Sequence, residues 1–356
     1  MEFFNLARYF ALGQQPFIPP FAELRQMRPV RITQDLLPVE EEDNLRHAED
    51  LARRGITVAP IQRQPPARNF VGRQDFPRRI LFEMTSKCNY LCRMCPQTNL
   101  KRPRVNMPGE LYRRVLDEID YHGIEGLWLY HLGESLLHPE WRQNIAHIKN
   151  KKNLGCIWMS TNGRLLTEEY MRLALDSNIT YINFSAHAVT EATYDTVAPP
   201  GNFAPVQQNL QKLYRLKGLS KNPKPPYLHV QMIEQETTRH EVDPFIACHY
   251  DKADIVSINM LEYVNLTNNA FGNRQRDRKP LKSCTRVSRN DCFICSNGSV
   301  TLCDAAYNGE IHLGNIQDKS LHEIWNGPER KKMLDLNAEE RMMEVEFCRN
   351  CTDHDI

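Results

Sequence analysis

The sequence predicts an α/β fold, a partial (β/α)6 barrel with an N-terminal extension and a small C-terminal module. Three observations support this architecture. From residue 78, short apolar runs alternate with amphipathic segments, which is typical of β/α units on a parallel sheet. Three cysteines fall within eight residues directly after the first apolar run, and a hairpin pattern begins beyond residue 280. We therefore expect an extension over 1–77, a barrel over 78–265 and a module over 266–356.

Composition limits the classes of function. The 356 residues are 41% hydrophobic and 25% charged, with 45 basic and 44 acidic residues and a formal net charge of +1. This balance predicts no nucleic-acid partner and no anionic membrane partner, and favours a polar small-molecule substrate. No apolar run approaches the roughly 18 residues of a spanning helix, and the N-terminus lacks the features of a signal peptide. We expect a cytoplasmic protein.

The N-terminal extension shows no alternation of strands and helices. It contains QPFIPPF, QPPARNF and one acidic-to-basic helical stretch, VEEEDNLRHAEDLARRG. A partly ordered leader is one interpretation of these features. A lid or a docking segment is the other.

The barrel region contains six predicted strands separated by helical patterns. The strands are expected at 79–84, 126–131, 155–160, 180–185, 227–233 and 254–261. The helices are expected at 108–122, 139–151, 166–176, 191–197, 204–217 and 239–249. Functional residues of such barrels lie at the carboxyl ends of the strands.

The C-terminal module begins with a hairpin pattern, CFICSNGSVTLC, whose Asn297-Gly298 pair suits a tight turn. A helical stretch, SLHEIWNGPERKKMLDL, follows the hairpin and leads to Cys348 and Cys351.

Eleven cysteines in a chain expected in a reducing compartment argue for metal ligation or catalysis. Cys88, Cys92 and Cys95 follow the first strand, where three thiolates can bind one iron-sulfur cube and leave its fourth iron open. The alternatives are a structural zinc site or a ferredoxin-like cluster, both of which require four protein ligands. No fourth cysteine lies nearby, and the closest downstream histidine is His122.

At these cysteines the sequence resembles the radical S-adenosylmethionine (SAM) superfamily, over about residues 78–265. The resemblance implies an enzyme with a [4Fe-4S] cluster that splits SAM to a 5′-deoxyadenosyl radical. It also implies a one-electron donor such as flavodoxin or ferredoxin.

A second motif resembles the Gly-Gly-Glu-Pro motif of this family. In the segment His131-Leu-Gly133-Glu134-Ser135, a leucine replaces the first glycine and Ser135 replaces the proline. The resemblance implies that Gly133 and Glu134 bind the amino group of SAM. It also implies contacts to the rest of SAM from Met94, where the family usually has an aromatic residue, and from Ser160, Asn162 and Ser185. Turn capping is the alternative role of the last three residues.

Beyond residue 280 the sequence resembles the short auxiliary-cluster module called SPASM/twitch, with Cys284, Cys303, Cys348 and Cys351. Four thiolates complete the protein ligands of a second [4Fe-4S] cluster, which would then have no open iron. A four-cysteine zinc site is the alternative.

Two further cysteines of the module, Cys292 and Cys295, are three residues apart on the predicted hairpin strand. They should therefore point to opposite faces of the sheet. Each is either a buried structural thiol or a hydrogen-atom donor to a substrate radical.

The predicted strands place polar side chains on one face. Asn183 with Ser185, His229 with Gln231, and Ser257 with Asn259 each share a face. The resulting polar lumen suits a sugar, an aminocyclitol or a peptide. The candidate proton acceptors near the strand ends are Glu83, His131, His187 and His229, each with a structural role as the alternative.

The leading hypothesis is an enzyme that removes a hydrogen atom from a sugar or aminocyclitol and oxidises an alcohol carbon. The chain resembles dehydrogenases of aminoglycoside-type biosynthesis, which share a single auxiliary cluster. An epimerase of a sugar-like substrate and a maturase of ribosomally made peptides are the enzymatic alternatives. A non-catalytic zinc or iron-sulfur scaffold is the alternative from another class.

Overall fold

The computed structural model describes residues 75–249, 252–260, 282–349 and 351. The expected N-terminal extension, except residues 75–77, and the expected domain boundary at 265 lie outside the described residues. No helix of the described part is long and apolar enough to cross a membrane.

Six parallel strands form the body of the sheet, each paired with the next strand along the chain. They are β1 (Arg79–Phe82), β2 (Gly126–Trp128), β3 (Cys156–Thr161), β4 (Tyr181–Ser185), β5 (Tyr227–Glu234) and β6 (Ile255–Met260). The predicted partial barrel is confirmed, and each strand falls within one residue of its predicted start.

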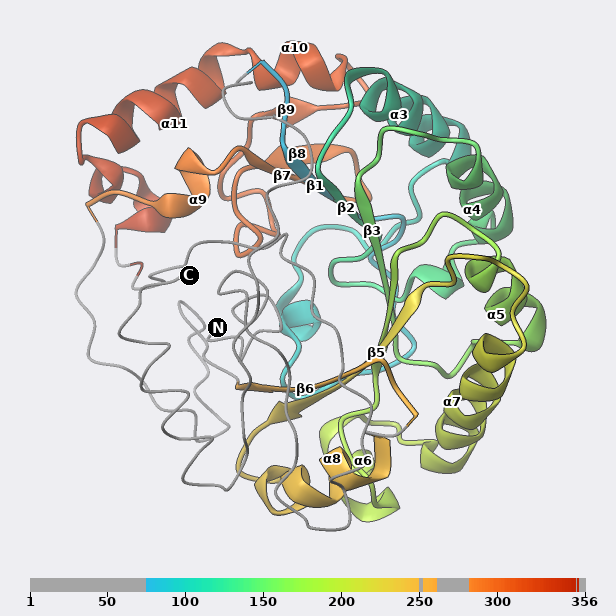
Figure 1. Ribbon diagram of the computed structural model, residues 1–356. Coiled ribbons are helices and arrows are strands. Elements are labelled where there is room, and N and C mark those ends of the chain that lie inside the picture. The colour runs from blue at the N-terminus through green and yellow to red at the C-terminus, as the bar shows by residue number, and fades with distance from the viewer. Residues whose placement is uncertain (1–74, 250–251, 261–281, 350, 352–356) are drawn as a thin grey trace, which may run out of the picture.

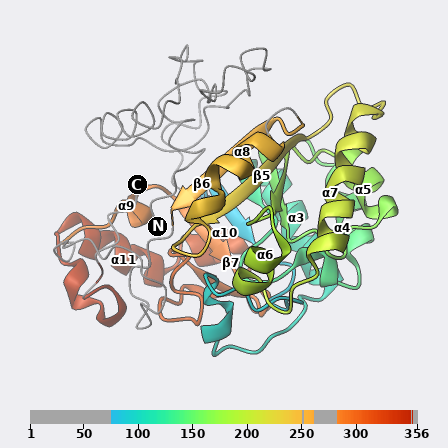
Figure 2. The same ribbon diagram turned by 90° about the horizontal axis from the view of Figure 1, so that it is seen from below.

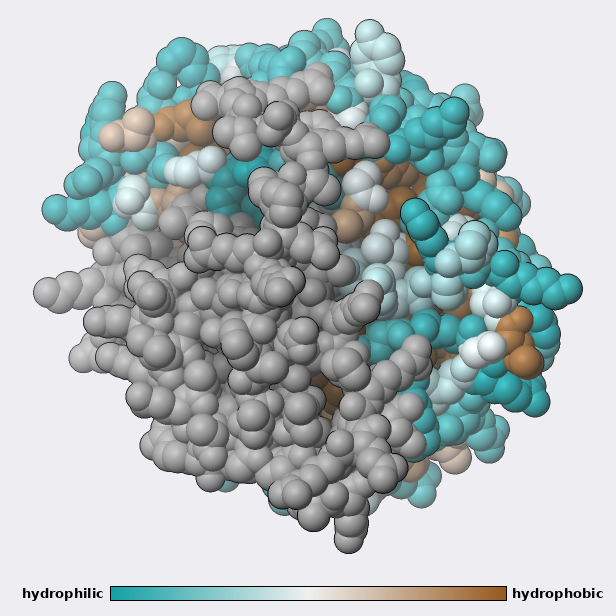
Figure 3. Space-filling model, viewed as in Figure 1, coloured by the Kyte–Doolittle hydropathy of each residue, from teal (hydrophilic) through white to brown (hydrophobic). Residues whose placement is uncertain are grey.

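Helices cover the outer face of this curved sheet (Figure 1). In chain order they are α3 (Gly109–His122), α4 (Trp141–Lys149), α5 (Glu168–Leu175), α6 (Glu191–Val197), α7 (Phe203–Gly218) and α8 (Val242–His249). Alternate residues of the strands, such as Ile80, Leu127, Ile182 and Val230, are fully or almost fully buried against them in one large core. The outward side chains of the helices give a mainly hydrophilic rim (Figure 3).

The C-terminal module extends the same sheet. Strand β7 (Asp291–Ile294) pairs in parallel with β1, while β8 (Ser299–Thr301) and β9 (Gly314–Asn315) continue antiparallel. The described strands thus form one nine-stranded sheet in the order β6-β5-β4-β3-β2-β1-β7-β8-β9. The predicted hairpin is confirmed, and Gly298 takes the positive φ of 84° that its turn requires.

The long helix expected after the hairpin is divided. Helix α10 (Leu321–Trp325) begins with a capping box at Ser320 and Glu323, and α11 (Pro328–Ala338) begins with proline at its first position. The short α9 (Thr285–Ser288) precedes β7 and was not predicted.

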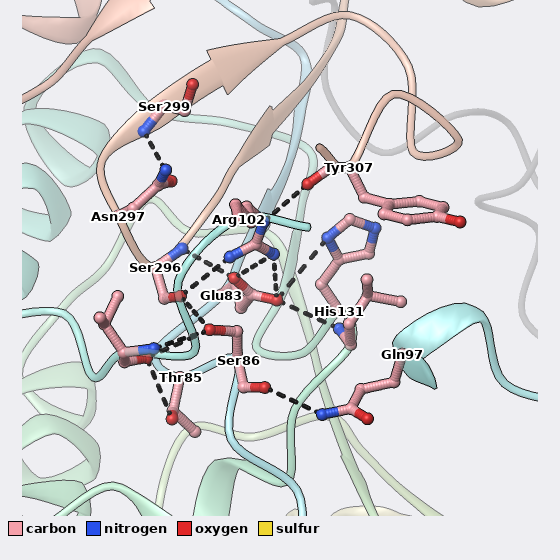
Figure 4. A network of polar contacts seen from close by, with 12 residues as sticks. Glu83, Thr85, Ser86, Gln97, Arg102, His131, Ser296, Asn297, Ser299 and Tyr307 are labelled. Atoms are coloured by element: carbon pink, nitrogen blue, oxygen red, sulfur yellow. Dashed lines mark hydrogen bonds and ion pairs between the residues drawn. The ribbon is translucent and has the colours of Figure 1, made fainter. Parts of the chain in front are cut away.

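A buried ion pair joins the barrel to the module (Figure 4). The guanidinium of Arg102 donates to both carboxylate oxygens of Glu83, at 2.9 and 2.7 Å, and to the carbonyl oxygen of Tyr307 at 2.6 Å. Glu83 also accepts from the backbone N–H groups of Leu132 and Ser296, at 3.2 and 2.7 Å. Four chain segments therefore meet at one carboxylate, which is fully buried.

Replacing Arg102 with methionine should leave the Glu83 charge buried without its partner. We expect the change to lower the free energy of unfolding by about 3–5 kcal/mol. The control is Arg142→Met, which breaks the exposed pair of Arg142 and Glu169 and should cost far less, because solvent screens that pair. Urea denaturation of the two variants checks this, and equal costs would contradict the importance of the buried pair.

Candidate functional site

The first three cysteines lie in the loop that leaves the carboxyl end of β1. Cys88, Cys92 and Cys95 are close enough to influence one another electrostatically. Burial raises the pKa of Cys88 to about 12 and raises the pKa of Cys92 well above its usual value. Each thiol therefore needs a strong positive charge beside it to ionise, which the iron atoms of a cluster supply.

The donor set fits a cluster. The thiols that hold a cube bind separate iron atoms and need not converge on one point. The ligands of a single metal ion must converge in this way. Among the described residues, no three His, Cys, Asp or Glu side chains converge in that way. The three thiols on one loop, with no fourth cysteine beside them, match a cube with one open iron.

Gly133 lies against the start of the cysteine loop. A Cβ atom at this position would come within 2.0 Å of the carbonyl oxygen of Thr85 and within 2.9 Å of that of Lys87. The next N–H, of Glu134, donates to the carbonyl of Lys87 at 2.9 Å. Only glycine permits this approach of the two loops.

The carboxylate of Glu134 is buried at the same loop crossing. It accepts hydrogen bonds from Leu136 N–H, Thr161 Oγ1 and Asn162 N–H, at 3.2, 3.0 and 2.7 Å. Burial nevertheless raises its pKa to about 7, because these donors only partly replace the lost water. A cationic group placed here would favour the ionised form.

The loop after β3 reaches the cysteine loop through Asn162. Its Nδ2 donates to Asn89 Oδ1 at 2.8 Å, while Asn89 Nδ2 has no partner among the described residues. Sequence reasoning missed Asn89, although its position directly after Cys88 was the available signal. Thr161 was also missed, because its side chain reaches Glu134 only through the fold.

The other residues that the family resemblance assigned to SAM have mixed surroundings. Met94 is buried in the main core. Ser160 Oγ accepts from Asn183 Nδ2 at 3.0 Å, and Ser185 Oγ accepts from Gln231 Nε2 at 3.4 Å. Both serines lie on the inner face of the sheet.

The inner face of β3 to β6 is polar toward the carboxyl ends, as predicted. Its described polar side chains are Ser160, Asn183, Ser185, His229, Gln231 and Ser257. The opposite residues, including Phe184 and Met232, are buried under the helices.

Four neighbouring strands carry an aromatic ladder on this inner face. Trp128, Trp158, Tyr181 and Tyr227 are register partners on β2, β3, β4 and β5. Successive ring centroids lie 6.4, 3.8 and 5.3 Å apart in stacked orientations. The ladder forms an apolar base below the polar side chains.

Two buried histidines lie near this inner face in the sequence of the sheet, His229 on β5 and His187 in the loop after β4. His229 Nε2 lies 2.6 Å from Ser257 Oγ, and burial lowers the pKa of His229 to about 3. His187 follows β4, has a positive φ of 59°, and has its pKa lowered by burial to about 4. The Nδ1 atoms of both rings have no partner among the described residues. Both histidines are therefore neutral near pH 7.

The loop at His187 is fixed by Glu241. This carboxylate accepts from Val189 N–H at 2.6 Å and contacts Thr190 Oγ1. The N–H of His187 donates to the Gln231 carbonyl at 3.2 Å. A non-glycine residue keeps such a strained backbone only where its surroundings hold it.

The other two predicted proton acceptors belong to the network of Figure 4. Both oxygens of Glu83 are filled by Arg102 and two backbone N–H groups, which leaves this carboxylate a structural role. His131 Nε2 lies 3.2 Å from the Asp304 carbonyl oxygen, and burial lowers the pKa of His131. Each residue connects the barrel to the module.

The second group of cysteines also forms one electrostatic set. The charge of Cys351 adds to the rise in the pKa of Cys284, and the charge of Cys284 adds to that of Cys303. The charges of Cys284 and Cys351 both add to the rise in the pKa of Cys348. Burial raises the pKa values of Cys284, Cys303 and Cys348, that of Cys348 to about 12. These four thiols suit a fully ligated cluster.

Arg286 lies beside these thiols. It lowers the pKa values of Cys284 and Cys303, although burial has the larger effect, and it forms an ion pair with Asp304.

The two hairpin cysteines differ in their surroundings. Cys292 pairs in register with Ile80 and belongs to the helix-covered core, so its thiol does not face the lumen. This position favours the structural alternative for Cys292 over hydrogen-atom donation. Cys295 follows the end of β7 and is buried, and burial with the charge of Glu83 raises its pKa to about 12.

Two family models match this chain. The model of the radical SAM superfamily matches residues 82–220, and that of an iron-sulfur cluster-binding domain, SPASM, matches residues 284–352. A curated relative, the tungsten-containing aldehyde ferredoxin oxidoreductase cofactor-modifying protein of Pyrococcus furiosus, is 25% identical over 114 residues. That match covers 32% of this chain and 32% of the relative.

Solved structures share the fold. BtrN in complex with AdoMet and 2-DOIA gives a TM-score of 0.52 at 18% identity, covering 79% of this chain and 95% of BtrN. Streptococcus suis SuiB bound to the precursor peptide SuiA gives 0.57 at 11% identity, covering 89% and 85%. Native anSMEcpe with bound AdoMet gives 0.55 at 14% identity, covering 77% and 88%.

Anaerobic reconstitution with iron and sulfide should load about eight irons per chain, four on each group of cysteines. Changing Cys88, Cys92 and Cys95 together to alanine should leave about four irons. Changing Cys284, Cys303, Cys348 and Cys351 together should also leave about four. Iron analysis checks both variants, and zinc in place of iron in either group would contradict the assignment.

Proposed function

Because this chain is a radical SAM protein with a SPASM domain, we propose that it removes a hydrogen atom from a sugar or aminocyclitol and oxidises an alcohol carbon. The observation that carries this proposal is the polar, uncharged inner face of β3 to β6. Asn183 Oδ1 and His229 Nδ1 on this face, and His187 Nδ1 in the loop after β4, have no partner among the described residues and can bind hydroxyl groups.

When bound, SAM and the two clusters would supply one-electron chemistry, with reduction of SAM at the barrel cluster and an electron acceptor at the SPASM cluster. Cys88, Cys92 and Cys95 would hold the first cluster, and Cys284, Cys303, Cys348 and Cys351 the second. Glu134 would bind the ammonium group of SAM. Gly133 would keep Glu134 against the cysteine loop.

The lumen favours an uncharged, hydroxyl-bearing group. No Asp, Glu, Lys or Arg side chain belongs to the inner face of β2 to β5, or of β6 as far as its side chains are described. The pKa values of His187 and His229, about 4 and about 3, keep both rings neutral. A buried ammonium group would find no counter-charge on these strands, so a sugar fits this face better than an aminocyclitol does.

Oxidation needs an acceptor for the hydroxyl proton, and His187 is the residue that we assign to this role. Its ring is neutral and buried, its Nδ1 has no partner in the part of the chain that the structure describes, and its loop is anchored by Glu241. His229 Nδ1 can accept only in the tautomer whose Nε2–H donates to Ser257. His229 is therefore better suited to orient the substrate.

Two alternatives are less well supported. Epimerisation requires a thiol that returns a hydrogen atom to the substrate carbon. Cys292 lies on the helix-covered face, which leaves Cys295 as the hairpin donor. Peptide maturation is supported by the shared fold with SuiB bound to a precursor peptide, at 11% identity, and with anSMEcpe bound to a Cp18Cys peptide, at 13%.

The fate of the substrate hydrogen distinguishes oxidation from epimerisation. Incubation with a panel of neutral sugars and polyols in heavy water should give one ketone for each 5′-deoxyadenosine and no solvent deuterium at the reacting carbon. Mass spectrometry of the products checks this. A redox-neutral product carrying one deuterium, lost in Cys295→Ala and retained in Cys292→Ala, would replace the proposal with epimerisation.

Binding of SAM should depend on pH through Glu134. The free carboxyl group has a pKa of about 7, and the ammonium group of SAM should lower it, so binding below pH 7 must expel a proton. We therefore expect the dissociation constant to rise about tenfold from pH 8 to pH 6. Equilibrium binding of SAM to the reconstituted protein measures this change.

The variant Glu134→Gln should bind SAM about 10–100-fold more weakly and lose this pH dependence. The control is Glu140→Gln, which changes a less buried carboxylate paired with Arg113 and should keep it. Unchanged affinity in Glu134→Gln would move the ammonium contact to another residue.

A further inference from the structure

The cysteine loop is strongly basic although the chain as a whole is almost neutral. Residues 84–108 contain Lys87, Arg93, Lys101, Arg102 and Arg104 and no aspartate or glutamate. The chain as a whole has 45 basic and 44 acidic residues, so the rest of the chain holds 40 basic and 44 acidic residues. A positive charge is thus concentrated on the one loop that would hold the barrel cluster.

Four of these five cations face solvent. Arg102 is buried with Glu83, whereas Lys87, Arg93, Lys101 and Arg104 are exposed. Within the described part of the chain, none of the four forms an ion pair, although Arg104 donates to the Gln97 carbonyl at 3.0 Å. Their charges therefore remain available to a partner.

An exposed apolar side chain lies on the same loop. Leu91, between Cys88 and Cys92, is 58% exposed. Its N–H donates to the Pro199 carbonyl at 2.8 Å, and the N–H of Arg93 donates to the Val197 carbonyl at 3.0 Å. These bonds fix the loop against the end of α6, so Leu91 is held at the surface. In Figure 2 the cyan segment of this loop forms an outer edge of the molecule.

Besides the buried Glu83 and Glu134, which act on Arg102 and Cys88, two exposed carboxylates act on the surroundings of the loop. In addition to burial, the charge of Asp195 on α6 raises the pKa of Tyr90, and the charge of Glu310 raises the pKa of Tyr307. Glu310 also accepts from Asn308 N–H at 3.0 Å. Four exposed cations outnumber these two acids, so the surface of the loop stays positive.

We infer that Lys87, Leu91, Arg93, Lys101 and Arg104 form the docking surface for an acidic one-electron carrier protein. This surface, the carrier surface, rests on the proposed function, because SAM cleavage consumes one external electron. The carrier gives up one electron and the barrel cluster gains it, with no other bond change in this step. Acidic groups on the carrier would meet the cations, and Leu91 would supply the apolar contact at the centre of an interface.

The position of the carrier surface suits electron transfer. The loop that contributes the cluster ligands is also the exposed loop, so a docked carrier would be separated from the cluster by a few residues. Attraction between exposed opposite charges mainly accelerates association and weakens as salt rises. Both effects are measurable.

The test uses the reconstituted full-length protein and reduced flavodoxin, an acidic carrier. The double variant Arg93→Glu with Lys101→Glu should lower the flavodoxin-driven rate of 5′-deoxyadenosine formation about tenfold or more, chiefly through a higher KM for flavodoxin. Binding of oxidised flavodoxin, measured by calorimetry, should weaken by a similar factor. Added salt should reduce the wild-type rate and have little effect on the variant.

The matched control is Lys149→Glu with Lys332→Glu, which makes the same change of net charge on α4 and α11. It should behave as the wild type. Leu91→Ala should raise the KM for flavodoxin without changing the salt dependence. Equal effects of the two double variants would overturn the inference, as would flavodoxin binding that is insensitive to them.

Reduction with dithionite distinguishes a failure of the docking surface from a failure of the proposed function. Because this small reductant needs no docking surface, the rate it supports should be the same in the wild type and in the Arg93 and Lys101 double variant. A parallel loss with dithionite would overturn the inference by revealing a damaged cluster loop. Selective binding of RNA or an acidic peptide in place of flavodoxin, with the same dependence on Arg93 and Lys101, would assign the surface to another anion. Failure of the wild type to form 5′-deoxyadenosine with dithionite would instead refute the proposed function.

Discussion

The buried carboxylate of Glu83 is the constraint on which the arrangement of the site depends. A charged group without water must find all its hydrogen bonds inside the protein, and Glu83 finds them in Arg102, Leu132 and Ser296. These donors come from the cysteine loop, the loop before Gly133 and the turn after β7. The carboxylate is satisfied only when the three segments are in place together. The same network thus fixes the cysteine loop and the loop of Gly133 and joins them to the SPASM module.

The parallel pairing of β7 with β1 also depends on contacts between residues that are far apart in the sequence. Periodicity predicted the six strands of the barrel and the hairpin, because each pattern is local. It could not predict that β7 continues the sheet beside β1, since Arg79 and Asp291 form their ion pair across 212 residues of sequence. The sequence left Glu83 open between a base and a structural role for a related reason: a polar residue at a strand end looks the same in sequence whether it binds a proton or a buried arginine. The break before Pro328, by contrast, was readable from the sequence, because proline favours the first turn of a helix.

For the site, the sequence predicted the cysteines and the polar lumen but not the environment of each group. Spacing identifies Cys88, Cys92 and Cys95, and alternation identifies Asn183 and His229. Burial determines the protonation states of these groups. It raises the pKa of Glu134 to about 7 and keeps His187 and His229 neutral. The aromatic ladder could have been read from the sequence, because each of four neighbouring strands carries one large ring close to its beginning or end. Its register across the sheet, however, is a property of strand pairing.

The separation of charge between the lumen and the cysteine loop fits hydrogen-atom chemistry. Moving a hydrogen atom between two carbons develops little charge, so fixed charges aimed at the reacting carbon would contribute little to lowering the barrier. Orientation and exclusion of water contribute more, and neutral side chains above an aromatic base provide both without the cost of burying ions. Charge is needed only where an electron enters or a proton leaves. The described cations of the cysteine loop lie where the electron would enter. The neutral His187, whose loop is anchored by Glu241, lies at a site suited to accepting the proton. A lumen free of charge and a basic outer loop are therefore two consequences of one requirement, that the radical be kept apart from the ions that accompany its formation and its decay.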